Sequence, residues 1–291
     1  MTETTLTPAL TAQKMFETAL AKNRQRLDLV FFKAFIAGVF LSFGGLLHVI
    51  ISGGSAGLTS TNPGLVKILG GLVFPVGLVM IVLQGQELLT SNMMTVPMLM
   101  IKRAAPWYSI PLNWTIVLFG NLTGSLFFAG VLTKASGILA AEPYPTYIRN
   151  FVIHKAMDPH WHQIFLRGIG CNWLVCIAVW QAMAASEVVS KIIAIFIPIF
   201  VFVAAGFDHG HLYRFFIPLG IMMGAKMTVA DYIKKSLIAS FLGNVVGALL
   251  VALPFMFFYN PSFQKEPRDI EEDGGSSATS IQVVPSTLKQ Q

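Results

Sequence analysis

Six long apolar stretches limit the possible fold more than any other feature of this sequence. About 20 apolar residues are needed for an α-helix to cross a bilayer. The stretches comprise residues 29–51, 64–83, 110–132, 164–182, 192–207 and 238–259. Charged residues make up only 12% of the chain and hydrophobic residues 54%, whereas about a quarter of the residues in a soluble domain are charged. The sequence therefore predicts an all-α membrane protein with six transmembrane helices.

Polar residues interrupt the second and fifth stretches. Gly85, Gln86 and Glu87 separate the second stretch from a further apolar piece at residues 93–101, and residues 208–211 separate the fifth from residues 215–222. The third and sixth stretches also contain near-copies of one motif, FGNLTGSL and LGNVVGAL. These matches indicate an inverted 3+3 repeat with helices 2 and 5 broken, because a unit of three helices re-enters the membrane from the opposite side. In transporters of this design, broken helices mark the substrate path.

Three regions are expected along the chain. Residues 1–28 form a cytosolic amphipathic segment, which either lies on anionic lipid or packs on the protein as a short helix. Residues 29–262 form the transport domain, and the polar residues 263–291 form a disordered cytosolic tail. The basic run at residues 22–33 and the even number of spans place both termini in the cytosol. We expect the plasma membrane as the location.

Several classes of function are disfavoured by composition and motifs. The net charge of +6 comes from scattered Lys and Arg residues, so no basic face for nucleic acid is expected. The two cysteines are not arranged in a CxxC pattern and are interpreted as helix-packing residues. The histidines between residues 154 and 162 lack the ligand set of a metal site. No nucleotide loop, nucleophile triad or redox motif occurs, so we expect neither an enzyme nor a cofactor.

Ionisable residues at bilayer depth are functional candidates because their burial is costly. They are Glu87, Arg167, Asp208, His209, His211 and Arg214. Glu87 and Asp208 are expected to stabilise the breaks by accepting hydrogen bonds from freed backbone N–H groups. His209 is expected to contact the substrate, since an imidazole can donate a hydrogen bond and exchange a proton near physiological pH.

Other polar residues have more ordinary interpretations. Lys155, before the fourth stretch, is expected to attract anions at a pore mouth. Asn172 could donate to a substrate or bind a neighbouring backbone. Asn121 and Asn244 lie in Gly-Asn-x-x-Gly runs and are expected to support close helix packing. His48, within the first stretch, is interpreted as a hydrogen-bonded packing residue.

Taken in order, the motifs resemble the formate/nitrite transporter family over residues 25–262. They are GQELLTS at residues 85–91, FGN at 119–121, His154-Lys155, residues 172–180, AGFDH at 205–209 and LGN at 242–244. Residues 161–176 resemble the fungal nitrite-transporting branch. The resemblance implies a homopentamer of aquaporin-like protomers, each with its own pore.

The resemblance also implies roles for individual residues. Thr90 and His209 would form the central pair, with Asn172 nearby and Lys155 in the outer vestibule. Phe74 and Phe202 would form the outer constriction, and Leu78, Leu88 and Val175 the inner one. Apolar constrictions reject a bare anion because of its desolvation cost but pass a small neutral acid. The expected function is proton-linked transport of a weak-acid monoanion, with nitrite as first choice.

Alternatives stay open at this stage. The cargo could be formate, lactate, acetate or hydrosulfide. A neutral-solute channel is disfavoured because the breaks lack paired Asn-Pro-Ala motifs. A non-transporting receptor or scaffold is a further possibility, because Tyr213 and Arg214 stand where the family usually has Asn and Met.

Overall fold

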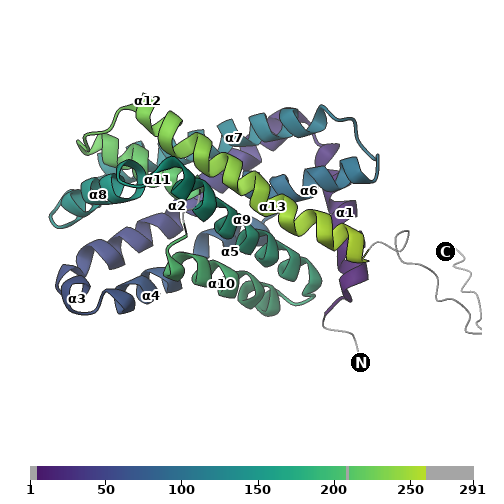
Figure 1. Cartoon of the computed structure of the whole chain (residues 1–291), viewed down its shortest axis with the longest axis horizontal. Helices are drawn as coiled ribbons and strands as arrows, with labels where there is room; N and C mark the ends of the chain where they lie inside the picture. Colours follow the sequence, from purple (N-terminus) through teal and green to yellow (C-terminus); the bar gives the residue numbers. More distant parts are fainter. Residues whose placement is uncertain (1–4, 208–209, 260–291) are drawn as a thin grey trace, which may run out of the picture.

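The computed structural model describes residues 5–207 and 210–259, without the side chains of residues 210–213. The described chain is almost entirely helical (Figure 1). The longer helices are α1 (Pro8–Asn23), α2 (Leu27–Gly54), α4 (Pro63–Val73), α5 (Val76–Leu83), α6 (Leu89–Ile101), α7 (Ser109–Phe127), α8 (Tyr144–Val152), α9 (Trp161–Ala184), α10 (Val188–Ala205), α11 (Gly210–Met222) and α13 (Ile238–Tyr259). Two short helices, α3 (Ala56–Thr61) and α12 (Val229–Asp231), and three π-helical segments, η1 (Phe128–Ala135), η2 (Ile153–Met157) and η3 (Tyr232–Leu237), complete the set.

Within the described residues, six helical segments are long and apolar enough to cross a membrane, as predicted. They are Leu27–Gly54, Pro63–Leu83, Ser109–Ala135, Trp161–Ala184, Val188–Ala205 and Val229–Tyr259. The sixth begins earlier than expected because η3 continues the helix toward α12. The all-α membrane fold is therefore confirmed, with boundaries that differ by a few residues.

Two helix pairs carry the most extensive packing, α2 with α7 and α9 with α13. Both pairs depend on glycine at the crossing point. A Cβ at Gly124 would collide with the backbone oxygen of Phe35, and one at Gly247 with that of Ile169. The small residues thus allow the backbones to approach closely, the packing mode that substitutes for hydrophobic driving force in lipid.

The helix of the second span ends at Leu83, and α6 begins at Leu89. Gly85 in the connection has φ +64°, a left-handed conformation that glycine adopts without strain. In the fifth span, α10 ends at Ala205 and Gly206 follows with φ +83°. Both apolar helices therefore stop at a left-handed glycine, and the proposed inverted repeat stays a prediction.

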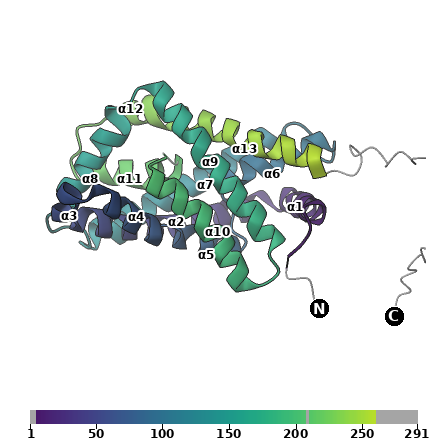
Figure 2. The same ribbon diagram turned by 60° about the horizontal axis from the view of Figure 1, so that its bottom comes forward.

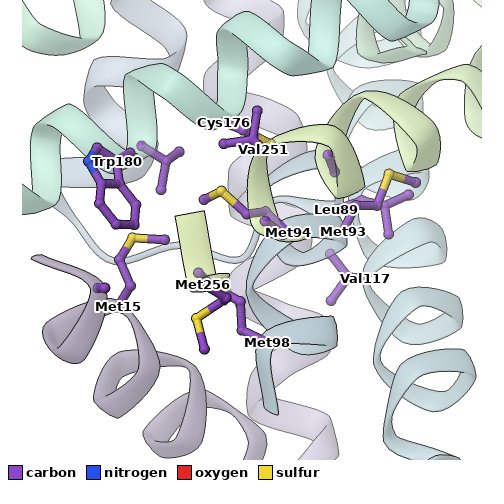
Figure 3. Packing of buried hydrophobic residues seen from close by; sticks show 14 of the residues in the cluster. Met15, Leu89, Met93, Met94, Met98, Val117, Cys176, Trp180, Val251 and Met256 are labelled. Carbon is purple, nitrogen blue, oxygen red and sulfur yellow. The ribbon is translucent and has the colours of Figure 1, made fainter. Parts of the chain in front are cut away.

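Of the two expectations for the N-terminal segment, the structure shows packing on the protein. Helix α1 buries Ala12, Met15 and Ala19 against the helical bundle. Figure 3 shows Met15 among the methionines of one buried cluster, with Trp180 of α9 nearby. In Figures 1 and 2, α1 lies at the opposite end of the molecule from α3 and α8. The expected tail at residues 263–291 lies outside the described residues.

The region before the fourth span differs from its predicted loop. Helix α8 and the π-helical η2 form a continuous helical segment that carries His154 and Lys155. Helix α8 has a strongly one-sided apolar face, with Ile148 and Val152 buried against α11. The segment formed by α8 and η2 is too short and too charged to span the membrane. It is ordered because the apolar face of α8 packs against α11.

Candidate functional site

One buried apolar cluster brings together the residues expected to form the two constrictions. Phe74, Leu78, Leu88, Val175 and Phe202 all belong to it, and each is at most 2% exposed. The rings of Phe74 and Phe202 meet edge to face, with centroids 5.8 Å apart and planes at 82°. The cluster therefore joins side chains from α5, α9 and α10 and the two connections that flank α5 into one apolar layer.

A cavity of about 410 Å³, here called the Lys155 cavity, lies beside this layer, which contributes Val203 to its lining. Its lining includes the basic residues His48, Lys67, His154 and Lys155 and no Asp or Glu within the described chain. Lys155 Nζ donates to the backbone oxygen of Gly206, at 3.3 Å. The cavity is thus positively charged and reaches the residue at which α10 ends.

A second cavity of about 130 Å³, here called the Thr95 cavity, is lined by Lys22, Ser91 and Thr95 and by residues of α1, α5, α6 and α9. The apolar layer touches both cavities, since Val203 lines the Lys155 cavity and Ile81 lines the Thr95 cavity. The layer therefore borders both a large cavity with basic residues and a smaller cavity that contains Lys22.

Two polar side chains are buried beside the apolar layer. Thr90 in the first turn of α6 and Asn172 in α9 are both 0% exposed. Asn172 Nδ2 donates to the backbone oxygens of Asn244, at 2.7 Å, and Thr90, at 3.3 Å. The Thr90 hydroxyl has no hydrogen-bond partner among the described residues. Because a buried hydroxyl without a partner is costly, this group is available to a ligand.

Asn121 binds the backbone of the break in the second span. Its Nδ2 donates to the backbone oxygens of Glu87 and Ala34, both at 2.8 Å, and its Oδ1 accepts from Leu89 N–H at 3.0 Å. This interaction satisfies one of the N–H groups that a helix start leaves free. The backbone-binding role expected for Glu87 therefore belongs to Asn121, whose bond to Ala34 of α2 also supports the expected helix packing.

The Glu87 carboxylate instead binds side chains. It is 1% exposed, with Oε1 3.2 Å from Lys22 Nζ and Oε2 accepting from Asn92 Nδ2 at 2.8 Å. Lys22 belongs to α1, which lies beneath the break. A charge at this depth is tolerated because a cation and an amide compensate it.

Three predicted site residues, Asp208, His209 and His211, have no described side chain, and neither has Tyr213. Arg214 is described: it lies in α11, which packs against η3, and is 1% exposed. Its side chain is thus enclosed within the protomer, against the start of the sixth span.

His48 packs as expected, since it meets Phe216 edge to face and its Nε2 lies 3.5 Å from Ser52 Oγ, and it also lines the Lys155 cavity. The sequence gives no sign of this place in the cavity, because the lining from α4, α8 and α10 is distant from α2 in sequence. Within the described ranges, no group of three or more His, Cys, Asp or Glu side chains is placed to hold a metal ion.

Six helices that are long and apolar enough to span a membrane define a multi-pass membrane protein, with an apolar cluster and two cavities among its helices. The chain belongs to the formate/nitrite transporter family, whose model matches residues 9–257. The family prediction is confirmed, while the resemblance to a fungal branch stays a prediction.

Individual relatives support the same assignment. The chain is 38% identical over 266 residues to a probable formate transporter of Methanothermobacter thermautotrophicus, covering 87% of this chain and 96% of that protein. It is 34% identical over 244 residues to the formate channel BtFdhC of Bacillus thuringiensis, covering 82% and 90%. A solved structure described as a pentameric formate channel with formate bound is similar with a TM-score of 0.69 and 26% identity, covering 80% of this chain and 97% of that one.

Proposed function

We propose that this protein transports a small weak-acid monoanion, of the size of formate or nitrite, together with a proton. The observation that carries the proposal is the Thr90 hydroxyl, which is fully buried beside the apolar layer without a partner among the described residues. The layer borders both cavities, and in the proposed path a solute crosses from one cavity to the other through this apolar section. A hydroxyl at that depth supplies a hydrogen bond where water is excluded.

The charges of the Lys155 cavity and the apolar character of the layer support transport of the anion together with a proton. Lys155 and the other basic residues of the Lys155 cavity raise the local concentration of anions. The apolar layer opposes entry of a bare anion, whose desolvation costs far more than that of a neutral acid. The anion therefore crosses with a proton, and Thr90 and Asn172, with His209, provide hydrogen bonds on the way.

Formate and nitrite are equally favoured as cargo. Nitrite is suggested by the resemblance of residues 161–176 to the fungal branch, and formate by relatives that are named for it. Both are small planar anions with two acceptor oxygens, which a short apolar section senses in similar ways. The proposed orientation has the Lys155 cavity facing outward and the Thr95 cavity facing the cytosol.

The proposed assembly is a homopentamer in the plasma membrane. The similar solved structure is pentameric, and α10 and α13 carry exposed apolar residues along their outer faces, among them Ile193, Ile197, Leu250 and Phe257. Native mass spectrometry in a mild detergent should give five times the mass of one chain. Monomers under conditions that keep the protein folded would contradict this part of the proposal.

Flux in liposomes tests the function. Purified protein is reconstituted, a pH gradient is imposed, and uptake of nitrite, formate, lactate, acetate and hydrosulfide is compared with that of His209→Ala protein. We expect uptake of formate or nitrite that rises with the inward proton gradient and falls strongly in the variant. Osmotic swelling without pH dependence would indicate a neutral-solute channel, and absence of flux in a folded assembly would indicate a receptor or scaffold.

A further inference from the structure

His48 occupies a polar corner of the Lys155 cavity. It lies on α2, and its Nδ1 faces Gly70 of α4 without a hydrogen bond of good geometry. A Cβ at Gly70 would lie only 2.7 Å from this nitrogen, so the glycine makes room for the imidazole. Its Nε2 is 3.5 Å from Ser52 Oγ, one turn along the same helix.

Tyr147 closes the corner from α8. Its ring packs on Gly53, where a Cβ would lie 3.1 Å from the ring, and it lines the cavity together with Ser52. Burial raises the pKa of Tyr147. The phenol is therefore neutral at physiological pH and can act as a hydrogen-bond donor.

The surroundings of these three side chains favour an anion. Lys67, His154 and Lys155 line the same cavity, and no carboxylate does so within the described chain. His154 Nδ1 is 2.9 Å from Asp158 in an exposed pair, which leaves the two lysines as the full positive charges of the lining. Imidazole, hydroxyl and phenol groups in a positive cavity match the two acceptor oxygens of a small planar anion.

We propose that His48, Ser52 and Tyr147 form a second binding subsite for the monoanion, within the Lys155 cavity and before the Phe74–Phe202 contact. This inference rests on the proposed function for the identity of the ligand. The subsite holds the hydrated anion by hydrogen bonds while Lys155 supplies charge. It acts on binding before the apolar layer, so it sets the concentration dependence of uptake and leaves the maximal rate nearly unchanged.

The test compares His48→Leu, His48→Gln and Tyr147→Phe with wild type and with His162→Leu. His162 is a matched control because it lies on α9 and is not part of the cavity lining. Uptake is measured against outside formate and nitrite concentration in liposomes. We expect the half-saturating concentration to rise about three- to tenfold in His48→Leu and Tyr147→Phe, as for the loss of one hydrogen bond. His48→Gln should recover part of the loss, and His162→Leu should match wild type.

Ligand binding is measured separately by saturation-transfer difference NMR with formate on protein in nanodiscs. Weaker saturation transfer to formate in His48→Leu and Tyr147→Phe than in wild type supports the subsite, whether or not the proteins show flux. If wild type and all variants lack flux but show this difference, only the proposed function fails. Unchanged half-saturation and unchanged transfer in a transporting protein overturn the subsite. If His48→Leu does not fold, Tyr147→Phe and Ser52→Ala decide the question by the same measurements. A wild type without any saturation transfer also overturns it.

Discussion

The two cavities beside the apolar layer differ in how their charges are compensated. The Lys155 cavity is large and is lined by basic residues without a carboxylate in the described chain. The Thr95 cavity is smaller, and its basic residue Lys22 is 3.2 Å from the buried carboxylate of Glu87. The described lining of the first cavity is therefore basic, while in the second the lysine pairs with a buried carboxylate and holds α1 against the break.

This difference separates two uses of lysine in one membrane protein. Lysines in a cavity whose described lining holds no carboxylate attract anions over several ångströms. A lysine paired with a buried carboxylate contributes to structure, because removing one partner leaves the other charge buried.

Replacement of Lys22, which lines the Thr95 cavity, is expected to have the largest effect, a loss of stability. Lys22→Met leaves the Glu87 carboxylate buried with Asn92 as its remaining side-chain partner. We expect a loss of about 1–3 kcal/mol in stability, less than for a fully buried pair because Lys22 is partly exposed. Thermal or SDS-induced unfolding of the purified protein measures this loss.

The matched control is Lys14→Met, which removes a lysine of the same helix whose Nζ donates to the backbone oxygen of Met183 at 3.4 Å. The double variant Lys22→Met, Glu87→Gln should recover part of the stability, because the uncompensated charge is gone. Equal stability of the Lys22→Met and Lys14→Met proteins would show that the ion pair does not hold α1.

A smaller effect is expected on the side of the Lys155 cavity. Lys155→Gln should lower uptake at low anion concentration several-fold, because the cavity loses one positive charge. Wild-type uptake should fall with added inert salt, and uptake by the variant should depend less on salt. Lys134→Gln serves as control, since Lys134 is exposed on η1. An identical salt dependence in all three proteins would refute anion attraction by Lys155.

The smallest effect is expected from Gly70→Ala. The added methyl group would lie 2.7 Å from His48 Nδ1 and shift the imidazole within the Lys155 cavity. We expect the half-saturating concentration to rise about threefold, less than for removal of the imidazole. Gly57→Ala is the control, because a Cβ there has no neighbour within 4 Å. If both alanine variants transport like wild type, the position of His48 does not affect uptake.

Hydropathy was sufficient to predict the six spans, because an apolar segment inside lipid has to form a helix to hydrogen-bond its own backbone N–H and C=O groups. It could not predict α8 and η2, since this segment is short and carries Arg149 and Lys155, and packing against α11 orders it. It also left two alternatives for α1. The choice between lipid and protein depends on the complementary surface of α6, α9 and α13, which no local pattern reveals.

The resemblance to the family implies roles for Thr90, Asn172 and the constriction residues, and these roles stay predictions. The structure shows that the constriction residues share one buried apolar cluster and that Thr90 and Asn172 are fully buried. Partners on distant helices were not predictable. Lys22 beside Glu87, Asn121 on the break and Gly70 beneath His48 depend on tertiary packing.

The central claim is that an anion crosses the apolar layer with a proton and uses the Thr90 hydroxyl on the way. Thr90→Val removes the hydroxyl with little change in shape, and uptake of formate and nitrite is measured in liposomes with and without an inward proton gradient. We predict gradient-dependent uptake in wild type and a loss of about tenfold or more in the variant, the effect of a missing hydrogen bond in a water-free section. Uptake by wild type that ignores the gradient, or equal uptake by the folded variant, would contradict the account.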